Sequence, residues 1–308
     1  MKKLLSILFL ALYCIQNLSA QQRPNIVLII SDDHAFQAIG AYGNKLVKTP
    51  GIDRIAKEGA IFQKACVANS LCGPSRASLL TGQYSHINGF KDNTNSVFDH
   101  NQDSFAKQLR AAGYQTAWIG KQHLGKTPQG FDYYAILPGQ GQYYNPDFIN
   151  MEGKLEREEG YVTNIITQKS EKWIDQRDQT KPFCIVIGHK ATHRSWAPDT
   201  ADFGRYDQVK FPIPGNFYDT YQGRTAASQQ TMSIMKDMTL AYDLKMNTPG
   251  QELKDGLLKR MNPAQKAAWK KYYEPIRADF EKRNLTGNAL AEWKFQRYMS
   301  DYMNTAAA

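Results

Sequence analysis

The sequence predicts an α/β fold with a mostly parallel central sheet flanked by helices. Three short apolar runs, at residues 24–30, 115–119 and 183–187, are typical of strands buried on both faces. Segments with a helical spacing of apolar residues separate these runs, and strands that alternate with helices favour a parallel sheet. Polar residues follow each run, at the carboxyl end where such sheets form their binding sites.

The elements between and after these strands have signals of their own. Phe105, Leu109 and Ala112 share one face of a predicted helix, and Gly113 is its stop signal. Residues 126–153 are rich in Gly, Pro, Tyr and Asn and predict a long ordered loop near a site. The chain from Arg224 onward is helical in pattern and highly charged. The predicted helices lie at residues 101–112, 161–174 and 288–304.

Composition excludes several classes of protein. The chain has 308 residues, of which 42% are hydrophobic and 22% charged, which is ordinary for a globular protein and excludes a disordered or collagen-like chain. The net charge of +9 indicates a basic surface that attracts anionic partners. No run of Lys and Arg is interleaved with aromatic residues, so we expect no nucleic-acid surface.

The first 20 residues have the pattern of a secretory signal peptide. Lys2 and Lys3 precede an apolar run at residues 4–15, and the small residues near Ala20 offer a cleavage site. The run is shorter than the ~20 residues that a membrane-spanning helix needs. A lipoprotein signal at Cys14 is the alternative, disfavoured because the bulky Tyr13 precedes it. We therefore expect a periplasmic or secreted α/β domain at residues 21–308, without a membrane span.

Residues 70–82 contain the strongest candidate for catalysis. Pro74 and Ser75 can begin a helix, which places Cys72 at the helix N-terminus, where the dipole favours negative charge. Arg76 lies one turn further on and can point back toward the thiol. A cysteine in such an electropositive position is a nucleophile candidate. The equally weighted alternative is a small buried cysteine or a disulfide partner for Cys66 or Cys184.

This stretch resembles the C-x-P-S-R signature of the type I sulfatases, which is followed by L-T-G as in residues 80–82. The resemblance implies the alkaline-phosphatase-like fold of that family. It also implies that a maturation enzyme oxidises Cys72 to formylglycine, whose hydrated aldehyde supplies the attacking oxygen, and that Arg76 stabilises this group. The family is longer than this chain, and the resemblance implies that the chain is an N-terminal fragment.

Two further stretches are similar to the same family. Residues 113–125 resemble its G-Y-x-T-x-x-x-G-K-x-H signature, which implies that Lys121 contacts the sulfate and that His123 contacts the modified cysteine. Asp32 and Asp33 follow the first predicted strand and are hard oxygen ligands suited to Ca²⁺. Alone, such a pair is more often a helix cap. The resemblance implies that both aspartates bind calcium together with the group at position 72.

Residues 189–196 follow the third predicted strand and resemble another part of the sulfatase site. The match implies that His193 contacts the sulfate and protonates the leaving oxygen. Thr192 replaces the proline that the family often has before this histidine, so His189 is a second candidate. Within this stretch, Arg194 is a candidate ligand for a carboxylate or sulfate and Trp196 for stacking on a sugar, with packing in the site wall as the alternative.

The substrate is predicted from similarity to a narrower group. Residues 137–146 and 193–196 resemble bacterial N-acetylglucosamine-6-sulfatases. The resemblance implies exo-acting hydrolysis of 6-O-sulfated N-acetylglucosamine in glycosaminoglycan or mucin-type glycans. The rival hypotheses are a phosphatase or phosphodiesterase of the same superfold and a non-catalytic protein that binds sulfated glycans.

Part of the family's site has no counterpart in this sequence. The remaining calcium ligands of the family and its second sulfate-binding lysine lie further along the chain. Asp301 and Asn304 belong to the predicted final helix and are not expected to replace those ligands. We therefore expect the chain by itself to lack part of the sheet and of the metal shell.

Overall fold

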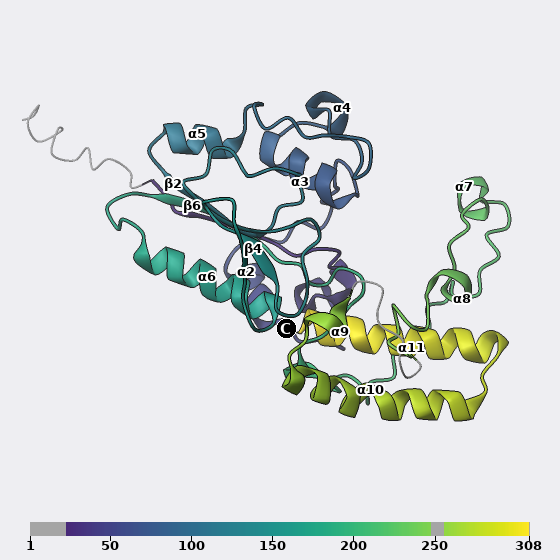
Figure 1. Cartoon of the computed structure of the whole chain (residues 1–308). Coiled ribbons are helices and arrows are strands. Elements are labelled where there is room, and N and C mark those ends of the chain that lie inside the picture. Colours follow the sequence, from purple (N-terminus) through teal and green to yellow (C-terminus); the bar gives the residue numbers. More distant parts are fainter. Residues whose placement is uncertain (1–22, 248–255, 308) are drawn as a thin grey trace, which may run out of the picture.

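The computed structural model describes residues 23–247 and 256–307, and its centre is a six-stranded sheet with helices on both faces (Figure 1). The strand order is β1-β6-β2-β3-β4-β5. Pairing is parallel from β1 through β3 and antiparallel for β4 and β5, which confirms the predicted mostly parallel α/β fold. The strands are β1 (Ile26–Ile30), β2 (Gln115–Lys121), β3 (Tyr133–Leu137), β4 (Asp147–Ile149), β5 (Leu155–Arg157) and β6 (Phe183–Gly188).

Helices cover the two faces of this sheet unequally. Figure 1 shows α3 and α5 on one face and α6 on the other. The helices among the described residues are α2 (Pro50–Glu58), α3 (Cys72–Thr81), α4 (Ser85–Asn88), α5 (Phe105–Ala111), α6 (Val162–Gln176), α7 (Thr225–Ser228), α8 (Ile234–Asp237), α9 (Leu257–Arg260), α10 (Pro263–Arg283) and α11 (Gly287–Ala306). Short 3-10 turns lie at Phe36–Ala38, Gly40–Tyr42 and Thr200–Asp202.

Alternation along the central strands builds the two main cores. In β2, Ala117 and Ile119 join the cluster that contains Ile166 of α6, whereas Trp118 joins the cluster that contains Ala77 of α3. Successive side chains of a strand point to opposite faces, so an unbroken apolar run is required where both faces are covered. The runs in β2 and β6 are predicted for this reason, and both strands are buried along nearly their whole length.

The first strand, β1, is less buried than β2 and β6. β1 pairs with β6 alone among the described residues, so it forms one edge of the described sheet. Val27 is 48% and Ile29 51% exposed, so the prediction that residues 24–30 are buried on both faces is wrong for the described part of the chain. The apolar run is present, but nothing among the described residues covers the face to which these two side chains point.

The segment at residues 126–153 is also corrected by the structure. It is not one long loop, because it contributes β3 and β4 to the sheet, and its glycines and prolines lie mostly in the turns. The predicted helix at residues 101–112 begins only at Phe105, where Ser104 caps the helix by accepting a hydrogen bond from the Lys107 amide. The signal-peptide prediction at residues 1–20 lies outside the described residues. Within them, no helix has the length and apolar character needed to cross a bilayer.

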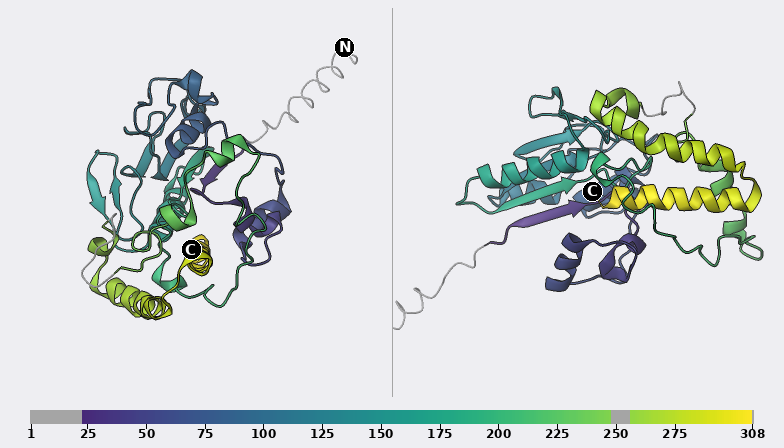
Figure 2. Two further views of the ribbon diagram at one scale, coloured as in Figure 1. Left: turned by 90° about the vertical axis from the view of Figure 1, so that its right-hand side faces the viewer. Right: turned by 90° about the horizontal axis from the view of Figure 1, so that it is seen from below.

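The C-terminal helices form a separate layer beside the sheet. α10 and α11 lie side by side in both views of Figure 2. Asn262 and Gln265 form a capping box at the start of α10. The end of α11 lies near the carboxyl end of β1. There the Tyr302 hydroxyl donates a hydrogen bond of 2.9 Å to the Asp33 carbonyl. The predicted helical pattern of the C-terminal region is confirmed. The contact of Tyr302 with Asp33 places this helical layer next to the candidate site.

Candidate active site

The carboxyl ends of three neighbouring strands meet at the candidate site. Asp32 follows β1, Lys121 is the last residue of β2, and His189 follows β6 directly. Backbone hydrogen bonds join the segments beyond the strands, with the His189 amide donating to the Ile30 carbonyl at 2.8 Å and the Asp32 amide to the Ala191 carbonyl at 2.9 Å. The parallel sheet thus holds these polar residues in a fixed relation to one another.

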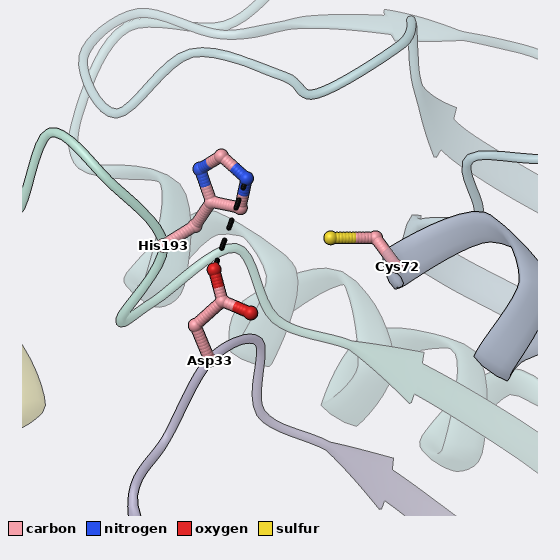
Figure 3. Close-up of side chains that lie close together, drawn as sticks. All are labelled: Asp33, Cys72 and His193. Atoms are coloured by element: carbon pink, nitrogen blue, oxygen red, sulfur yellow. Dashed lines mark ion pairs between the residues drawn. The ribbon is translucent and has the colours of Figure 1, made fainter. Parts of the chain in front are cut away.

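Cys72 reaches the same place from the first turn of α3. Leu71 before it is extended, and the Cys72 thiol donates a hydrogen bond of 3.5 Å to Asp32 Oδ1. Ligand atoms of Asp33, Cys72 and His193 all lie within 4.8 Å of one another (Figure 3). Asp32, Asp33 and Cys72 also line a cavity of about 340 Å³. The predicted position of Cys72 at a helix N-terminus is therefore confirmed.

Two buried cations hold the carboxylate of Asp32. Lys121 is fully buried and forms an ion pair with Asp32 Oδ2, and Arg76 Nη2 lies 3.6 Å from the same oxygen. Burial raises the pKa of Asp32, but Lys121 and Arg76 outweigh this effect, so the pKa lies below its ordinary value. Asp32 is therefore ionised at neutral pH and is paired with two cations at the floor of the site.

The thiol of Cys72 is not activated by this environment. Burial raises the pKa of Cys72, and the negative charges of Asp32 and Asp33 raise it further, against the opposing effect of Lys121. We expected from the sequence that the helix dipole and Arg76 would activate the thiol, and the structure corrects this expectation. The carboxylates of Asp32 and Asp33 lie close to the thiol and oppose its ionisation. Cys66, Cys72 and Cys184 are free thiols in the structure, so a disulfide explanation of Cys72 finds no support.

One nitrogen of the His193 ring faces Asp33, which lines the cavity. Its Nε2 lies 4.0 Å from Asp33 Oδ2, as Figure 3 shows, and its Nδ1 lies 2.5 Å from the Arg194 carbonyl. A carbonyl can only accept a hydrogen bond, so the proton of the neutral ring is on Nδ1 and the Nε2 lone pair faces the site. Burial, together with Lys121 and Lys190, lowers the pKa of His193 to about 4.

His189, the second candidate for this role, lies deeper in the protein. Burial and the charge of Arg76 lower its pKa to about 4. Its Nδ1 is buried and has no hydrogen-bond partner within residues 23–247 and 256–307. His189 is not among the three residues whose ligand atoms converge at the cavity, so His193 is better placed for contact with a ligand.

His123 and Lys121 share a neighbour that the sequence analysis missed as a functional residue. Gln140 Oε1 accepts a hydrogen bond of 2.5 Å from Lys121 Nζ, and Gln140 Nε2 lies 3.3 Å from His123 Nε2. Gln140 belongs to the stretch at residues 137–141 that resembles one group of carbohydrate sulfatases. That local similarity was the available signal, although it indicated substrate choice rather than contact with the two motif residues.

Arg194 and Trp196, the two candidate substrate residues, each have a partner within the protein. Arg194 Nε and Nη2 donate to the two carboxylate oxygens of Asp243 at 2.6 and 2.7 Å. The Trp196 ring packs edge-on against Tyr298, with 4.7 Å between the ring centroids. These contacts agree with the alternative of wall packing, and they leave the two substrate roles as proposals.

Comparison with known proteins identifies the family. The family model described as Sulfatase matches residues 24–307. The chain belongs to the sulfatase family. An N-acetylglucosamine-6-O-sulfatase of Bacteroides thetaiotaomicron is 46% identical over 297 residues, covering 93% of this chain and 53% of that protein. The human N-acetylgalactosamine-6-sulfatase is 32% identical over 218 residues, covering 56% of this chain and 40% of that protein.

Solved sulfatase structures also resemble the fold. A structure of BT4656 in complex with its substrate D-glucosamine-2-N,6-O-disulfate superposes with a TM-score of 0.88 and 45% identity. The match covers 92% of this chain and 59% of that one. This chain therefore spans little more than half the length of the first curated relative and of this structure.

Hydrogen bonds to main-chain carbonyls fix the turn that carries His193. We call residues 193–198 the His193 turn. Side chains from distant loop segments donate to its carbonyls. These bonds are Tyr143 to His193, Lys245 to Ser195 and Trp196, Tyr161 to Ala197 and Tyr144 to Pro198. Lys245 is fully buried and also contacts Asp301 Oδ2 at 3.1 Å. Asp301 thus supports the His193 turn from α11, a role that its sequence pattern did not indicate.

The residues of this sulfatase-family site fit part of a calcium shell. Asp33 is 56% exposed at the cavity, and its pKa is raised by burial and by the adjacent charge of Asp32. Two neighbouring carboxylates that repel one another are stabilised by a divalent cation, and Ca²⁺ prefers 6–8 oxygen ligands at about 2.3–2.6 Å. Asp32 and Asp33 are the only acidic residues that line this cavity among the described residues. The described chain therefore offers some of the oxygen ligands that such a cation would need.

Proposed function

We propose that the protein hydrolyses sulfate esters of carbohydrates at the cavity between β1 and α3. One observation carries the proposal: Cys72 lies within hydrogen-bond distance of Asp32, which itself contacts the buried cations Lys121 and Arg76. The membership of the sulfatase family supports the same reaction. The charge on the oxygens of a sulfate ester grows as the S–O bond breaks, and preorganised cations stabilise such charge.

Arg76 and Lys121 would provide most of this stabilisation from the protein. Both are nearly inaccessible to water, with exposed fractions of 3% and 0%, so their charges act at low dielectric. Arg76 Nη1 donates to the Lys121 carbonyl at 2.6 Å, which fixes the guanidinium relative to β2. Cations that are already in place need no reorganisation when an anion binds, which is the condition for a large electrostatic effect.

His193 would hold the proton for the leaving alcohol. In the free protein the ring is neutral at neutral pH, since its pKa is about 4, and its one proton is on Nδ1, so Nε2 is unprotonated. A bound sulfate ester places negative charge beside Nε2, and a neighbouring opposite charge favours the imidazolium form. The ring then has a proton on Nε2, at the nitrogen that faces the cavity, and can donate it to a poor leaving group, an effect worth ~10²–10⁴-fold.

Two groups that are absent from the amino-acid sequence complete the proposal. Formylglycine, formed from Cys72 by a maturation enzyme, would supply the nucleophilic oxygen that the thiol cannot provide. Ca²⁺, held by Asp32, Asp33 and the oxygen at position 72, would neutralise charge on the sulfate. The raised pKa of Cys72 supports this view, because an unmodified thiol at this position is a weak nucleophile.

The proposed substrate is 6-O-sulfated N-acetylglucosamine or a closely related amino sugar at the end of a glycosaminoglycan or mucin-type glycan, from which exo-acting hydrolysis releases sulfate. The basis is the 46% identity with a protein named N-acetylglucosamine-6-O-sulfatase and the TM-score of 0.88 with a structure that contains a 6-O-sulfated glucosamine. The signal-peptide pattern of residues 1–20 supports a periplasmic or secreted location.

The test begins with protein produced alongside a formylglycine-generating enzyme. Mass spectrometry of the peptide that contains position 72 reports conversion of the thiol to the aldehyde. We expect the matured protein to release sulfate from N-acetylglucosamine 6-sulfate, to lose this activity when Ca²⁺ is removed by a chelator, and to regain it when Ca²⁺ is returned.

Cys72→Ala is the matched control, because it keeps the fold of α3 and removes the side chain to be modified. N-acetylglucosamine 6-phosphate is the control substrate. Release of phosphate without release of sulfate would support the phosphatase alternative. Tight binding of the sulfated sugar by fully converted protein, without turnover, would support the glycan-binding alternative and contradict our proposal.

A further inference from the structure

The side chain of Gln140 lies between Lys121, the last residue of β2, and His123 in the turn that follows. Its side-chain amide contacts Lys121 through Oε1 at 2.5 Å and His123 through Nε2 at 3.3 Å. Its own carbonyl accepts a hydrogen bond of 3.1 Å from Lys190 Nζ, which ties the turn at residues 138–141 to the segment after β6. Gln140 is therefore held at both ends, by its main chain and by its amide.

The contact with Lys121 determines how the amide is oriented. An ammonium group has only donors, so the atom of Gln140 that faces it must be the carbonyl oxygen. The NH₂ group of Gln140 then faces His123 Nε2 and can only donate. His123 Nε2 must therefore be an acceptor, which places the ring proton of neutral His123 on Nδ1.

This assignment leaves His123 with one uncommitted donor. Its Nδ1 is buried and has no hydrogen-bond partner among the described residues. The His123 main chain lies beside the start of α3, since a Cβ added to Gly73 would meet the His123 carbonyl oxygen at 3.0 Å. A buried N–H without a partner is costly, and a ligand that accepts a hydrogen bond removes that cost.

We propose that Gln140 is a positioning residue that fixes His123 in the Nδ1–H tautomer and holds Lys121 Nζ beside Asp32. It acts on the reaction through these two residues and does not itself contact the substrate. This inference rests on the proposed function for its kinetic part only, because the tautomer of His123 is measured without turnover. His123 is neutral at neutral pH, where the measurement is made, since burial and the nearby cation Lys121 lower its pKa to about 4.

Nitrogen NMR of protein labelled with ¹⁵N-histidine reports the tautomer of each ring at pH 8. His123→Asn identifies the His123 signals by their loss. We expect Nδ1–H in the wild type. Gln140→Glu keeps an acceptor for Lys121 but presents an acceptor to His123 Nε2 also, so we expect the proton to move to Nε2. Gln140→Leu removes both contacts, and we expect the strict preference for Nδ1–H to be lost.

Kinetics of the matured enzyme give a second readout. We expect Gln140→Glu to lower kcat by roughly 10²-fold, the usual cost of losing one preorganised hydrogen-bond donor, with a much smaller change in KM. Gln142→Leu is the matched control, because Gln142 lies two residues away and has no described bond to Lys121 or His123. It should change neither the tautomer nor kcat.

The two readouts separate failure of this inference from failure of the proposed function. Wild-type His123 in the Nε2–H form, or an Nδ1–H signal that is unchanged in both Gln140 variants, overturns the inference whether or not the enzyme is active. Absence of any sulfatase activity in fully converted wild type contradicts the proposed function and leaves the NMR result as the test of Gln140.

Discussion

At the scale of single residues, the site is organised around the buried carboxylate of Asp32. This group accepts a hydrogen bond from Cys72 and forms ion pairs with Lys121 and Arg76, so one side chain contacts three of the residues that the sulfatase signatures contain. A buried charge is stable only when it is paired, and each of these contacts therefore depends on the others. Removal of any one of them would disturb charge balance as well as geometry.

The role proposed for His193 predicts a dependence on the leaving group. His193→Asn removes the proton donor while Asn keeps a polar side chain of similar reach. We expect hydrolysis of a sugar sulfate to fall by roughly 10²-fold or more, because an alkoxide is a poor leaving group. An aryl sulfate whose phenol leaves readily should lose far less. The measurement is kcat/KM for both esters with wild type and variant.

His86→Asn is the control for this comparison, because His86 is exposed and lies outside the cavity. An equal loss of activity on the sugar and aryl esters in His193→Asn would contradict the role of proton donor and indicate a role in binding alone.

Several site residues were predicted from short sequence motifs, and others could not be. Asp32, Cys72 and Lys121 belong to stretches in which neighbouring residues define both a signature and a local structure. Gln140 and Lys245 act across long separations in the chain, 19 residues from Lys121 and 56 residues from Asp301 respectively. A single sequence contains no local pattern for such a contact, so only the folded structure identifies them.

At the scale of elements, two glycines allow β2 and β6 to end at the site. Gly120 pairs with Gly188, and a Cβ added at Gly120 would lie 2.2 Å from the Gly188 carbonyl oxygen. Gly120 also has a φ of +95°, which side chains other than glycine rarely adopt. This close approach lets Lys121 reach Asp32 across the intervening strand.

Gly120→Ala tests this account. The new methyl group must displace backbone atoms and adopt a strained φ, so we expect the free energy of unfolding to fall by roughly 3 kcal/mol or more. Denaturant titration provides the measurement. Gly153→Ala is the matched control, since Gly153 has a φ of +75° and no atom within 4 Å of the added Cβ. It should cost about 1–2 kcal/mol, and an equal loss in both variants would show that close packing at Gly120 is unimportant.

Strands and helices were predictable to different degrees. β2, β6 and α6 were predicted within two residues at each end, because unbroken apolar runs indicate the two buried strands and apolar residues at helical spacing indicate the helix. β3 and β4 were missed, because each is short and is bordered by the glycines and prolines of tight turns. The exposed face of β1 was missed because a run of aliphatic residues indicates burial without indicating what provides it.

At the scale of the whole molecule, buried histidines make stability depend on pH. The pKa of His189 is lowered from 6.5 to about 4, with burial as the main cause. The unfolded chain therefore binds a proton more readily than the folded protein between these two values. Stability from this group is complete above about pH 6.5 and is lost as the pH falls toward 4.

His189→Gln should make the stability of the protein less sensitive to acid. We expect the loss of free energy of unfolding between pH 7 and pH 4.5 to be smaller in the variant by about 2 kcal/mol, from an ordinary histidine pKa in the unfolded state. Urea titrations at several pH values give the measurement. The exposed His86→Gln variant should retain the wild-type dependence, and the same dependence in His189→Gln would refute the assignment.

The bond from Lys245 to the His193 turn links the order of synthesis to the assembly of the candidate site. Asp301, the partner of the buried Lys245 ammonium, belongs to α11 and is translated more than 100 residues after His193. Before α11 is synthesised, the Lys245 ammonium lacks this carboxylate partner, and an unpaired charge remains in water rather than in a protein interior. The position proposed for His193 therefore depends on a helix that is synthesised late and packs beside the candidate site.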